Sequence, residues 1–491
     1  MKRSAPLLAV CLLLLIAANS GLDRRLAVGI YADEGTQFAI ARSLMSGEMR
    51  YLAVKDSTLL FAKGPVFSLT LAIWWRISGT AGANLDALFL ARSLVFLLHG
   101  LNLCLLYQII RRRSANVFLA GTAVLLWALF PLARLLNPLA FSYHCATTLV
   151  LLSWLFWCHA QKNRRNEDRW RYLAAFSFGG ALLTDLVTWT LLPGFLVAFS
   201  RVRLRKGAKL WLIALSPTLS FVLLQLGISA EATQMDLQAL GTRISANAIT
   251  VPWLILRTNL HNLILAAPWF PLCLLGVWVL PRQLRAECFG FVVIPLLWVA
   301  STVPIMGLAA YHLIPWLPWF ALLAAALLVR VAMHTGRKQL TGSWFKALLV
   351  AFVAGLWLFS GPDDSYARVS VSPAEASATV QFLQDRRKPE ELVLASPALA
   401  WMLPGKAADF QMALAAEGKP SVHLPRDLPA ERFAFDARFA AAQFAVLDDQ
   451  LFRWALVRMP DLVGHIARIE ADWRLVFQTP SLKVYQRASL P

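Results

Sequence analysis

Charged residues are scarce in this sequence. Only 15% of its 491 residues are Asp, Glu, Lys or Arg, whereas 58% are hydrophobic. Soluble domains usually carry about 25% charged residues. The shortage of charge and the excess of apolar side chains exclude an ordinary soluble protein and predict a polytopic membrane protein.

Acidic residues are rarer than basic ones, 28 against 47, which gives a net charge of +19. Such an excess is common in nucleic-acid-binding proteins, but here the basic residues form short clusters between apolar runs. No basic groove-binding module or aromatic stacking motif accompanies them. The clusters are typical of cytoplasmic loops that face an anionic membrane leaflet, so we expect no nucleic-acid partner.

Cysteine is also rare. The six cysteines lie in or beside hydrophobic segments, so a disulfide framework is not predicted. The sequence lacks zinc-type Cys/His spacing and a glycine-rich phosphate loop. The acidic pair just after the last apolar run, Asp363-Asp364, reads as a linker turn rather than a divalent-metal site. We therefore expect neither a metal nor a required cofactor.

Apolar runs near the 20 residues or so needed to span a bilayer recur along the chain. Those that read as single crossings are 86–110, 115–134, 141–160, 210–228, 263–280, 288–304, 313–329 and 344–360. The run 172–199 lies between two basic clusters and must leave and re-enter the cytoplasm, which predicts two short helices broken near Thr184-Asp185. The run 6–18 is either a signal peptide or an uncleaved first helix, and the poor cleavage site favours the helix.

The stretch 65–77 is too short for a span, and counting it as one would place the Arg111 cluster outside. Its Trp74-Trp75-Arg76 cluster suits the headgroup region, so an interfacial or re-entrant helix is predicted. About eleven crossings follow, with the N-terminus in the cytoplasm and both the 21–84 loop and the C-terminal region on the outer face.

Two domains are expected. Residues 1–360 form the transmembrane domain, whose first outer loop covers 21–84. Residues 361–491 show strand-like runs at 391–395, 444–447 and 475–477 beside a helical stretch at 374–386. This pattern predicts a small α/β domain. The fold class is thus a polytopic α-helical membrane protein with interfacial helices and a C-terminal α/β domain outside the membrane.

The adjacent carboxylates Asp33-Glu34 are the most informative feature for function. They lie near the start of a predicted helix, where the positive end of the helix dipole stabilises negative charge. A helix N-terminal charge pair is one explanation. Ionisable groups at a membrane face more often serve a substrate, an ion path or a partner charge.

Context makes this pair distinctive. Asp33-Glu34 is followed by an Ala41-Arg42-Ser43-Leu44 helix, and then by Phe61-Ala62-Lys63-Gly64-Pro65, which opens the short 65–77 helix. This order resembles the first outer loop of the GT-C glycosyltransferases, in particular the protein O-mannosyltransferases and the lipid A aminoarabinose transferases. Later landmarks occur in the same order, at 136–139, 181–185 and 311–318. The resemblance spans nearly the whole chain, although only the first loop is distinctive.

The resemblance implies a chemistry. Such enzymes transfer a sugar from a polyprenyl-phosphate carrier to a lipid, glycan or protein acceptor at the outer membrane face. Lys63 matches the family's phosphate-contacting lysine, and Asp33 matches the acidic residue that binds the acceptor and accepts its proton. Single displacement would invert the anomeric centre. A bacterial inner membrane, with the C-terminal domain in the periplasm, is the implied location.

Other residues are weaker candidates. Glu34 is expected to orient the acceptor or to support Asp33, because adjacent residues at a helix start diverge. Arg42 suits either the phosphate or a structural salt bridge. Tyr311, His312, Arg257 and His261 are possible cavity-lining groups, with a structural or solvated role as the alternative for each.

Two positions depart from the family pattern. Asn137 stands where the aminoarabinose branch usually has Asp, and Thr184-Asp185-Leu186 stands where it usually has Thr-Lys-Gly. Both change the charge where a donor headgroup would lie, which indicates a different donor, a different pose, or a member that is inactive or re-purposed.

Two further classes of protein fit the composition. A transporter or flippase for lipid-linked saccharides would also be polytopic, but it usually shows internal repeats and midplane charges. A non-catalytic assembly protein would use the C-terminal domain for docking. The concentration of charge in one outer loop favours the transferase.

Overall fold

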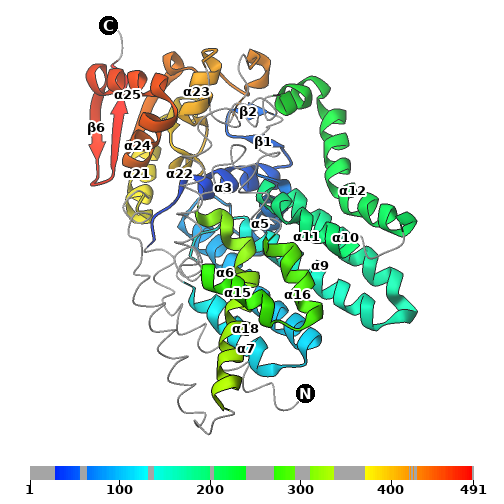
Figure 1. Ribbon diagram of the computed structural model, residues 1–491. Helices are drawn as coiled ribbons and strands as arrows, with labels where there is room; N and C mark the ends of the chain where they lie inside the picture. Colours follow the sequence, from blue (N-terminus) through cyan, green and yellow to red (C-terminus); the bar gives the residue numbers. More distant parts are fainter. Residues whose placement is uncertain are drawn as a thin grey trace.

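The computed structural model describes residues 28–55, 63–130, 138–199, 204–238, 270–293, 310–336 and 371–488, apart from 420, 422–423 and 425–427. A bundle of helices occupies the lower part of Figure 1, and the sheet with its helices occupies the upper part. Helices α3 (Ala32–Met45) and α5 (Pro65–Ile77) lie where these two parts meet. This junction is where the candidate site forms.

The lower bundle consists of long apolar helices. Its principal members are α6 (Leu85–Ser114), α7 (Val117–Leu129), α9 (Tyr143–Lys162), α10 (Glu167–Thr184), α12 (Leu204–Ile228), α15 (Phe270–Val279) and α18 (Leu317–Gly336). Three segments in the described part, Leu85–Ser114, Arg205–Ile228 and Ile314–Val331, are long and apolar enough to cross a membrane. The predicted runs 86–110, 210–228 and 313–329 match these three. The 344–360 run and the N-terminal 6–18 run lie outside the described residues.

The break predicted near Thr184-Asp185 is present. Helix α10 ends at Thr184, and Asp185 is extended with φ −160° and ψ 142°. The Asp185 carboxylate then accepts a hydrogen bond from the Val187 amide and caps the 3-10 helix η2 (Leu186–Leu191), which leads into α11 (Leu192–Phe199). An aspartate competes with the helix for backbone donors, which explains why the chain turns here.

The short helix α5 has the predicted bounds. Leu69, Ile73 and Ile77 recur every four residues and are exposed. On its other side the Trp75 indole donates to the Ala87 carbonyl of α6 at 2.9 Å. One apolar face exposed and one face packed is the pattern of an interfacial helix, and placement at a membrane surface remains a prediction.

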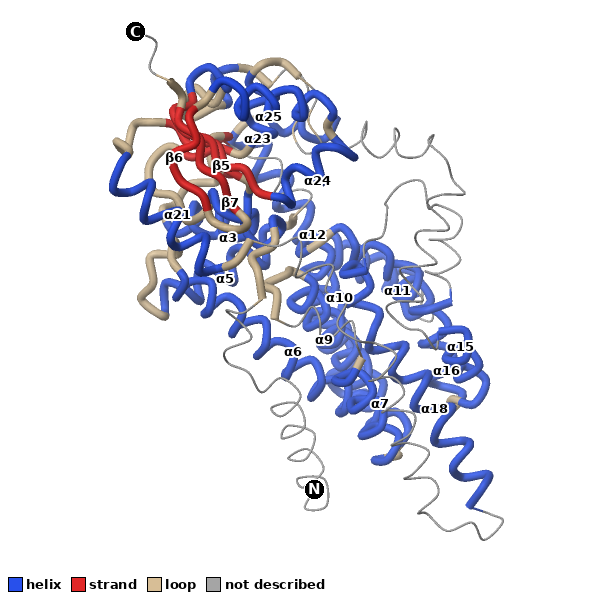
Figure 2. Tube along the Cα trace, turned by 90° about the vertical axis from the view of Figure 1, so that its left-hand side faces the viewer, coloured by secondary structure: helices blue, strands red, loops and turns tan. Residues whose placement is uncertain are grey.

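The upper part contains a five-stranded sheet in the order β4-β3-β5-β7-β6. Its strands are β4 (Ala407–Ala408), β3 (Leu392–Ala395), β5 (Ala442–Asp448), β7 (Leu482–Gln486) and β6 (Arg474–Gln478). The strands β4, β3 and β5 are parallel, whereas β7 runs antiparallel to β5 and β6. Figure 2 shows the sheet with α21 (Pro373–Arg386), α24 (Asp449–Arg458) and α25 (Pro460–Asp472) around it. The strands expected at 391–395, 444–447 and 475–477 correspond to β3, β5 and β6, and the expected helix to α21.

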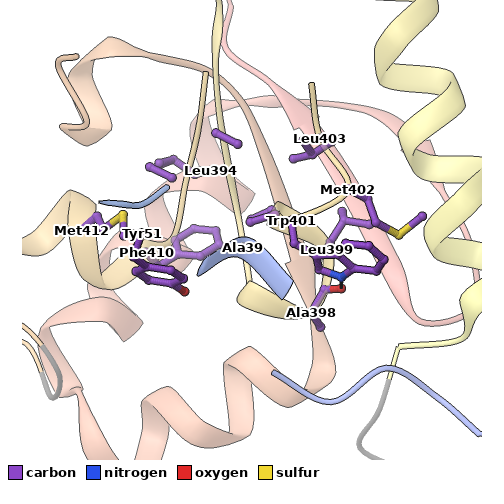
Figure 3. Close-up of a cluster of buried hydrophobic side chains, with 14 of the residues drawn as sticks. Ala39, Tyr51, Leu394, Ala398, Leu399, Trp401, Met402, Leu403, Phe410 and Met412 are labelled. Carbon is purple, nitrogen blue, oxygen red and sulfur yellow. Dashed lines mark hydrogen bonds between the residues drawn. The ribbon is translucent and has the colours of Figure 1, made fainter. Parts of the chain in front are cut away.

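The hydrophobic core of the upper part includes α3. The Phe38 ring lies 4.8 Å from the Trp401 ring between centroids, and both side chains are buried. Figure 3 shows Ala39 and Tyr51 among side chains of the C-terminal region, such as Leu399 and Phe410. The predicted domain boundary at 360/361 lies outside the described residues, but the core itself joins the first loop to the C-terminal region.

Candidate active site

Asp33 and Lys63 form an ion pair at the junction of the two parts. The Lys63 Nζ lies 3.0 Å from the Asp33 Oδ2, and the two side chains are 17% and 24% exposed. Asp33 belongs to the first turn of α3, where the helix dipole favours its charge. Lys63 comes immediately before Gly64, the residue that caps α5. The structure therefore brings the two main predicted site residues together and leaves both accessible.

Gly64 explains how Lys63 reaches this position. A Cβ atom on Gly64 would lie 1.7 Å from the carbonyl oxygen of Leu183, near the end of α10. Only glycine allows the two backbones to approach so closely. The sequence Lys63-Gly64 is thus pressed against the break in α10, two residues before Asp185.

Asp185 is buried beside this pair. Its Oδ2 accepts a hydrogen bond from the Ser142 hydroxyl at 2.7 Å, and its Oδ1 accepts one from the Val187 amide at 3.0 Å. Burial raises the pKa of the Asp185 carboxyl, the Lys63 charge opposes that rise, and the Asp33 charge adds to it. Sequence analysis singled out Asp185 as a departure from the family pattern, and the structure places it within the electrostatic environment of the Asp33–Lys63 pair.

Glu34, the residue next to Asp33, is completely buried. Its carboxylate accepts hydrogen bonds from Arg92 Nε at 3.0 Å and Nη2 at 2.8 Å, and from the Tyr31 and Ala140 amides at 3.1 and 2.6 Å. Arg92 also donates to the Val28 and Gly29 carbonyls. Glu34 thus fixes the start of α3 beside Asp33. Arg92 was missed from the sequence, because an arginine within an apolar run carries no local sign of its partner.

The segment 138–142 contacts two acidic side chains of the site, Glu34 and Asp185. Its Ala140 amide binds Glu34, and its Ser142 hydroxyl binds Asp185. Asn137, which precedes it, lies outside the described residues, as do Arg257 and His261. The Tyr143 ring, one residue further, lies 5.7 Å from the His312 ring in an edge-on contact.

His312 belongs to the 3-10 helix η5 (Ala310–Trp316), as does Tyr311. Burial first, and then the Lys63 charge, lower the pKa of His312 to about 3 against the opposing effect of Asp33. The imidazole is therefore neutral at physiological pH, so it can offer a hydrogen bond but no positive charge to a phosphate.

Arg42 lies away from this cluster. Its Nη1 donates to the carbonyls of Trp401 and Leu403 at 2.9 and 3.0 Å. About two turns nearer the start of α3, a Cβ on Gly35 would lie 1.8 Å from the Pro397 carbonyl oxygen. Both contacts tie α3 to the C-terminal region. The two hydrogen bonds of Arg42 thus go to backbone carbonyls and not to the carboxylate of the predicted salt bridge, and a phosphate role for Arg42 stays a prediction.

In the described ranges, no group of three or more His, Cys, Asp and Glu is placed to hold a metal ion. The arrangement instead combines an accessible carboxylate, a lysine at salt-bridge distance and a rigid buried support beneath them. Such a set can accept a proton on the carboxylate and stabilise an anionic oxygen with the lysine.

The fold of the whole chain can be compared with solved structures. The chain has the fold of the GT-C glycosyltransferases, as the first-loop motifs indicated. It is similar to the crystal structure of ArnT from Cupriavidus metallidurans bound to undecaprenyl phosphate, with 15% identity, a TM-score of 0.64, and coverage of 98% of this chain and 97% of that one. The same enzyme in its apo state gives 14% identity and a TM-score of 0.61, with 98% and 97% covered.

A third structure shares the fold. The archaeal oligosaccharyltransferase AglB from Archaeoglobus fulgidus, in complex with an inhibitory peptide and a dolichol-phosphate, has 11% identity and a TM-score of 0.53, over 99% of this chain and 75% of that one. No protein-family model matches the chain, and no curated protein is significantly similar in sequence. The similarity to these structures therefore lies in the fold, and not in overall sequence identity.

Proposed function

We propose that the chain is a membrane glycosyltransferase that moves a sugar from a polyprenyl-phosphate donor to an acceptor. The Asp33–Lys63 pair carries this proposal, because its two side chains are oppositely charged, accessible and in contact at 3.0 Å. The fold supports it, since the ArnT crystal structure contains undecaprenyl phosphate and the AglB structure is a complex with a dolichol-phosphate.

The proposed reaction is a nucleophilic substitution at the anomeric carbon of the sugar. The acceptor oxygen attacks that carbon, and the bond from the carbon to the phosphate oxygen breaks. Lys63 stabilises the negative charge that develops on the departing phosphate. Asp33 orients the acceptor hydroxyl and takes its proton, which is worth about 10² to 10⁴-fold in rate. Attack from the face opposite the phosphate inverts the anomeric configuration.

The buried groups serve this step by holding Asp33 and Lys63 in place. Glu34 and Arg92 fix the start of α3, and Gly64 brings Lys63 against α10. Preorganised charges stabilise a transition state without rearranging during the reaction. The acceptor, a glycan, a lipid such as lipid A or a protein, would approach from the outer face, which we place on the periplasmic side of a bacterial inner membrane.

Native mass spectrometry of the gently solubilised protein, beside Lys63→Ala, tests the proposal. The control is Lys206→Ala, because Lys206 also lies 3.0 Å from an aspartate, Asp168, but both side chains are about half exposed. We expect undecaprenyl phosphate or its glycoside on the wild type and on Lys206→Ala, and at least tenfold less on Lys63→Ala. Equal retention by all three proteins would move the phosphate site elsewhere. A transfer assay with the bound glycoside then identifies the acceptor.

A further inference from the structure

Asp185 places a second carboxylate beside Lys63. The Asp185 side chain is 4% exposed, and hydrogen bonds from Ser142 and Val187 hold both of its oxygens. Because Gly64 packs on the Leu183 carbonyl, Lys63 lies next to the chain segment that ends in Asp185. Lys63 is thus a cation with two carboxylates near it: Asp33 at 3.0 Å, and Asp185, whose carboxyl feels the Lys63 charge.

Two negative charges around one positive charge affect donor and product unequally. The following argument rests on the proposed function. The donor is a phosphodiester and carries one negative charge. When the sugar leaves with the acceptor oxygen, the phosphate keeps the electron pair of the broken bond and becomes a monoester, which carries about 1.5 to 2 negative charges at pH 7. The acceptor proton goes to Asp33 and then to solvent.

We propose that Asp185 is a specificity-determining residue that disfavours the polyprenyl phosphate product relative to the glycosylated donor. Coulomb repulsion scales with the product of the charges, so a fixed carboxylate repels the monoester about 1.5 to 2 times as strongly as the monoanionic diester. A repulsion that weakens donor binding threefold therefore weakens product binding about fivefold to ninefold. Lys63 supplies the attraction that both ligands share, and Asp185 supplies the difference between them, which limits product inhibition.

The test compares two lipids that differ by one methyl group and by the negative charge that this group removes. The probes are undecaprenyl phosphate and its methyl phosphodiester, and the measurement is the Kd of each in nanodiscs for wild type and Asp185→Asn. The asparagine keeps an oxygen that can accept from the Val187 amide, and the Ser142 hydroxyl can rotate to suit the amide. We expect Asp185→Asn to bind the diester about threefold and the monoester about fivefold to ninefold more tightly than the wild type.

Controls separate a local charge effect from a general one. Asp168→Asn removes an exposed carboxylate at the other end of α10, about 25 Å away along the helix axis at 1.5 Å per residue. It should leave both Kd values unchanged. Asp185→Ser, whose hydroxyl can also cap the Val187 amide, should reproduce the effect if the asparagine variant does not fold.

The outcomes are distinguishable. If both lipids bind the wild type and neither substitution changes the ratio of their Kd values, the role of Asp185 is wrong while the proposed function stands. If the two lipids tighten equally, the residue acts on shape rather than charge, and the inference fails as well. If the wild type binds neither lipid, the proposed function fails, and with it the inference.

Discussion

Glu34 and Arg92 lie 58 positions apart and form an ion pair in which both side chains are completely buried. The contact is bidentate, with Nε–Oε1 at 3.0 Å and Nη2–Oε2 at 2.8 Å. The carboxylate also accepts from two backbone amides, and the guanidinium donates to two carbonyls. A buried pair with this many partners is costly to separate. The pair therefore fixes the position of the backbone at Asp33, the residue next to Glu34 in the sequence.

We expect Glu34→Gln to lower the free energy of unfolding by about 3–5 kcal/mol, because it leaves Arg92 charged and buried without a counterion. Thermal unfolding in detergent, followed by the loss of soluble protein, measures the change. Glu167→Gln is the control, since Glu167 pairs with Arg171 one turn apart on a partly exposed helix face and should cost at most about 0.5 kcal/mol. Similar losses in the two variants would contradict a structural role for the Glu34–Arg92 pair.

Asp33→Asn should separate chemistry from folding. Asp33 is 24% exposed, so losing its pair with Lys63 should cost no more than about 1 kcal/mol of stability. Loss of the general base should slow transfer about 10² to 10⁴-fold. Single-turnover transfer with an excess of enzyme measures the rate, beside Asp168→Asn as an inert carboxylate. A rate equal to that of the wild type would remove Asp33 from the reaction.

Gly64→Ala tests the close approach that positions Lys63. The new methyl group would lie 1.7 Å from a backbone carbonyl oxygen that cannot rotate away, so the variant should lose about 3 kcal/mol, the upper end for overpacking. It should also retain at least tenfold less bound carrier than the wild type. Gly100→Ala, in α6 with nothing within 4 Å, should be stabilised by up to about 1 kcal/mol. Normal carrier binding by Gly64→Ala would show that Lys63 does not depend on this contact.

Tyr51→Phe should change how the stability of the protein depends on pH. The Tyr51 hydroxyl donates to Asp409 Oδ2 at 2.8 Å between buried side chains. Burial raises the pKa of Asp409, whereas the Met412 amide and Tyr51 lower it, so removal of the hydroxyl should raise this pKa further. A raised pKa in the folded state means that stability is full below the unfolded pKa and is lost as the pH rises. The variant should therefore melt lower than the wild type by a margin that widens from pH 4.5 to pH 8. A constant margin would show that the pKa of Asp409 does not depend on Tyr51.

Much of the fold could be read from local patterns. The break at Asp185 and the strands β3, β5 and β6 follow from hydrophobic period and from residues that compete for backbone hydrogen bonds. Asp33 and Lys63 stand out because charges are rare beside apolar runs. The crossing number, the membrane orientation and the roles of the outlying candidates stay predictions, and Arg257, His261 and Asn137 lie outside the described residues.

The sequence alone predicted the fold class and the two residues at the centre of the candidate site, because composition, periodicity and motif order are local properties. What only the tertiary structure decided is the support of that site. The pairing of Glu34 with Arg92, the contact of Gly64 with Leu183 and the place of Asp185 beside Lys63 each join segments far apart in the chain. Such contacts depend on how helices pack against one another, and no local pattern of residues records that packing.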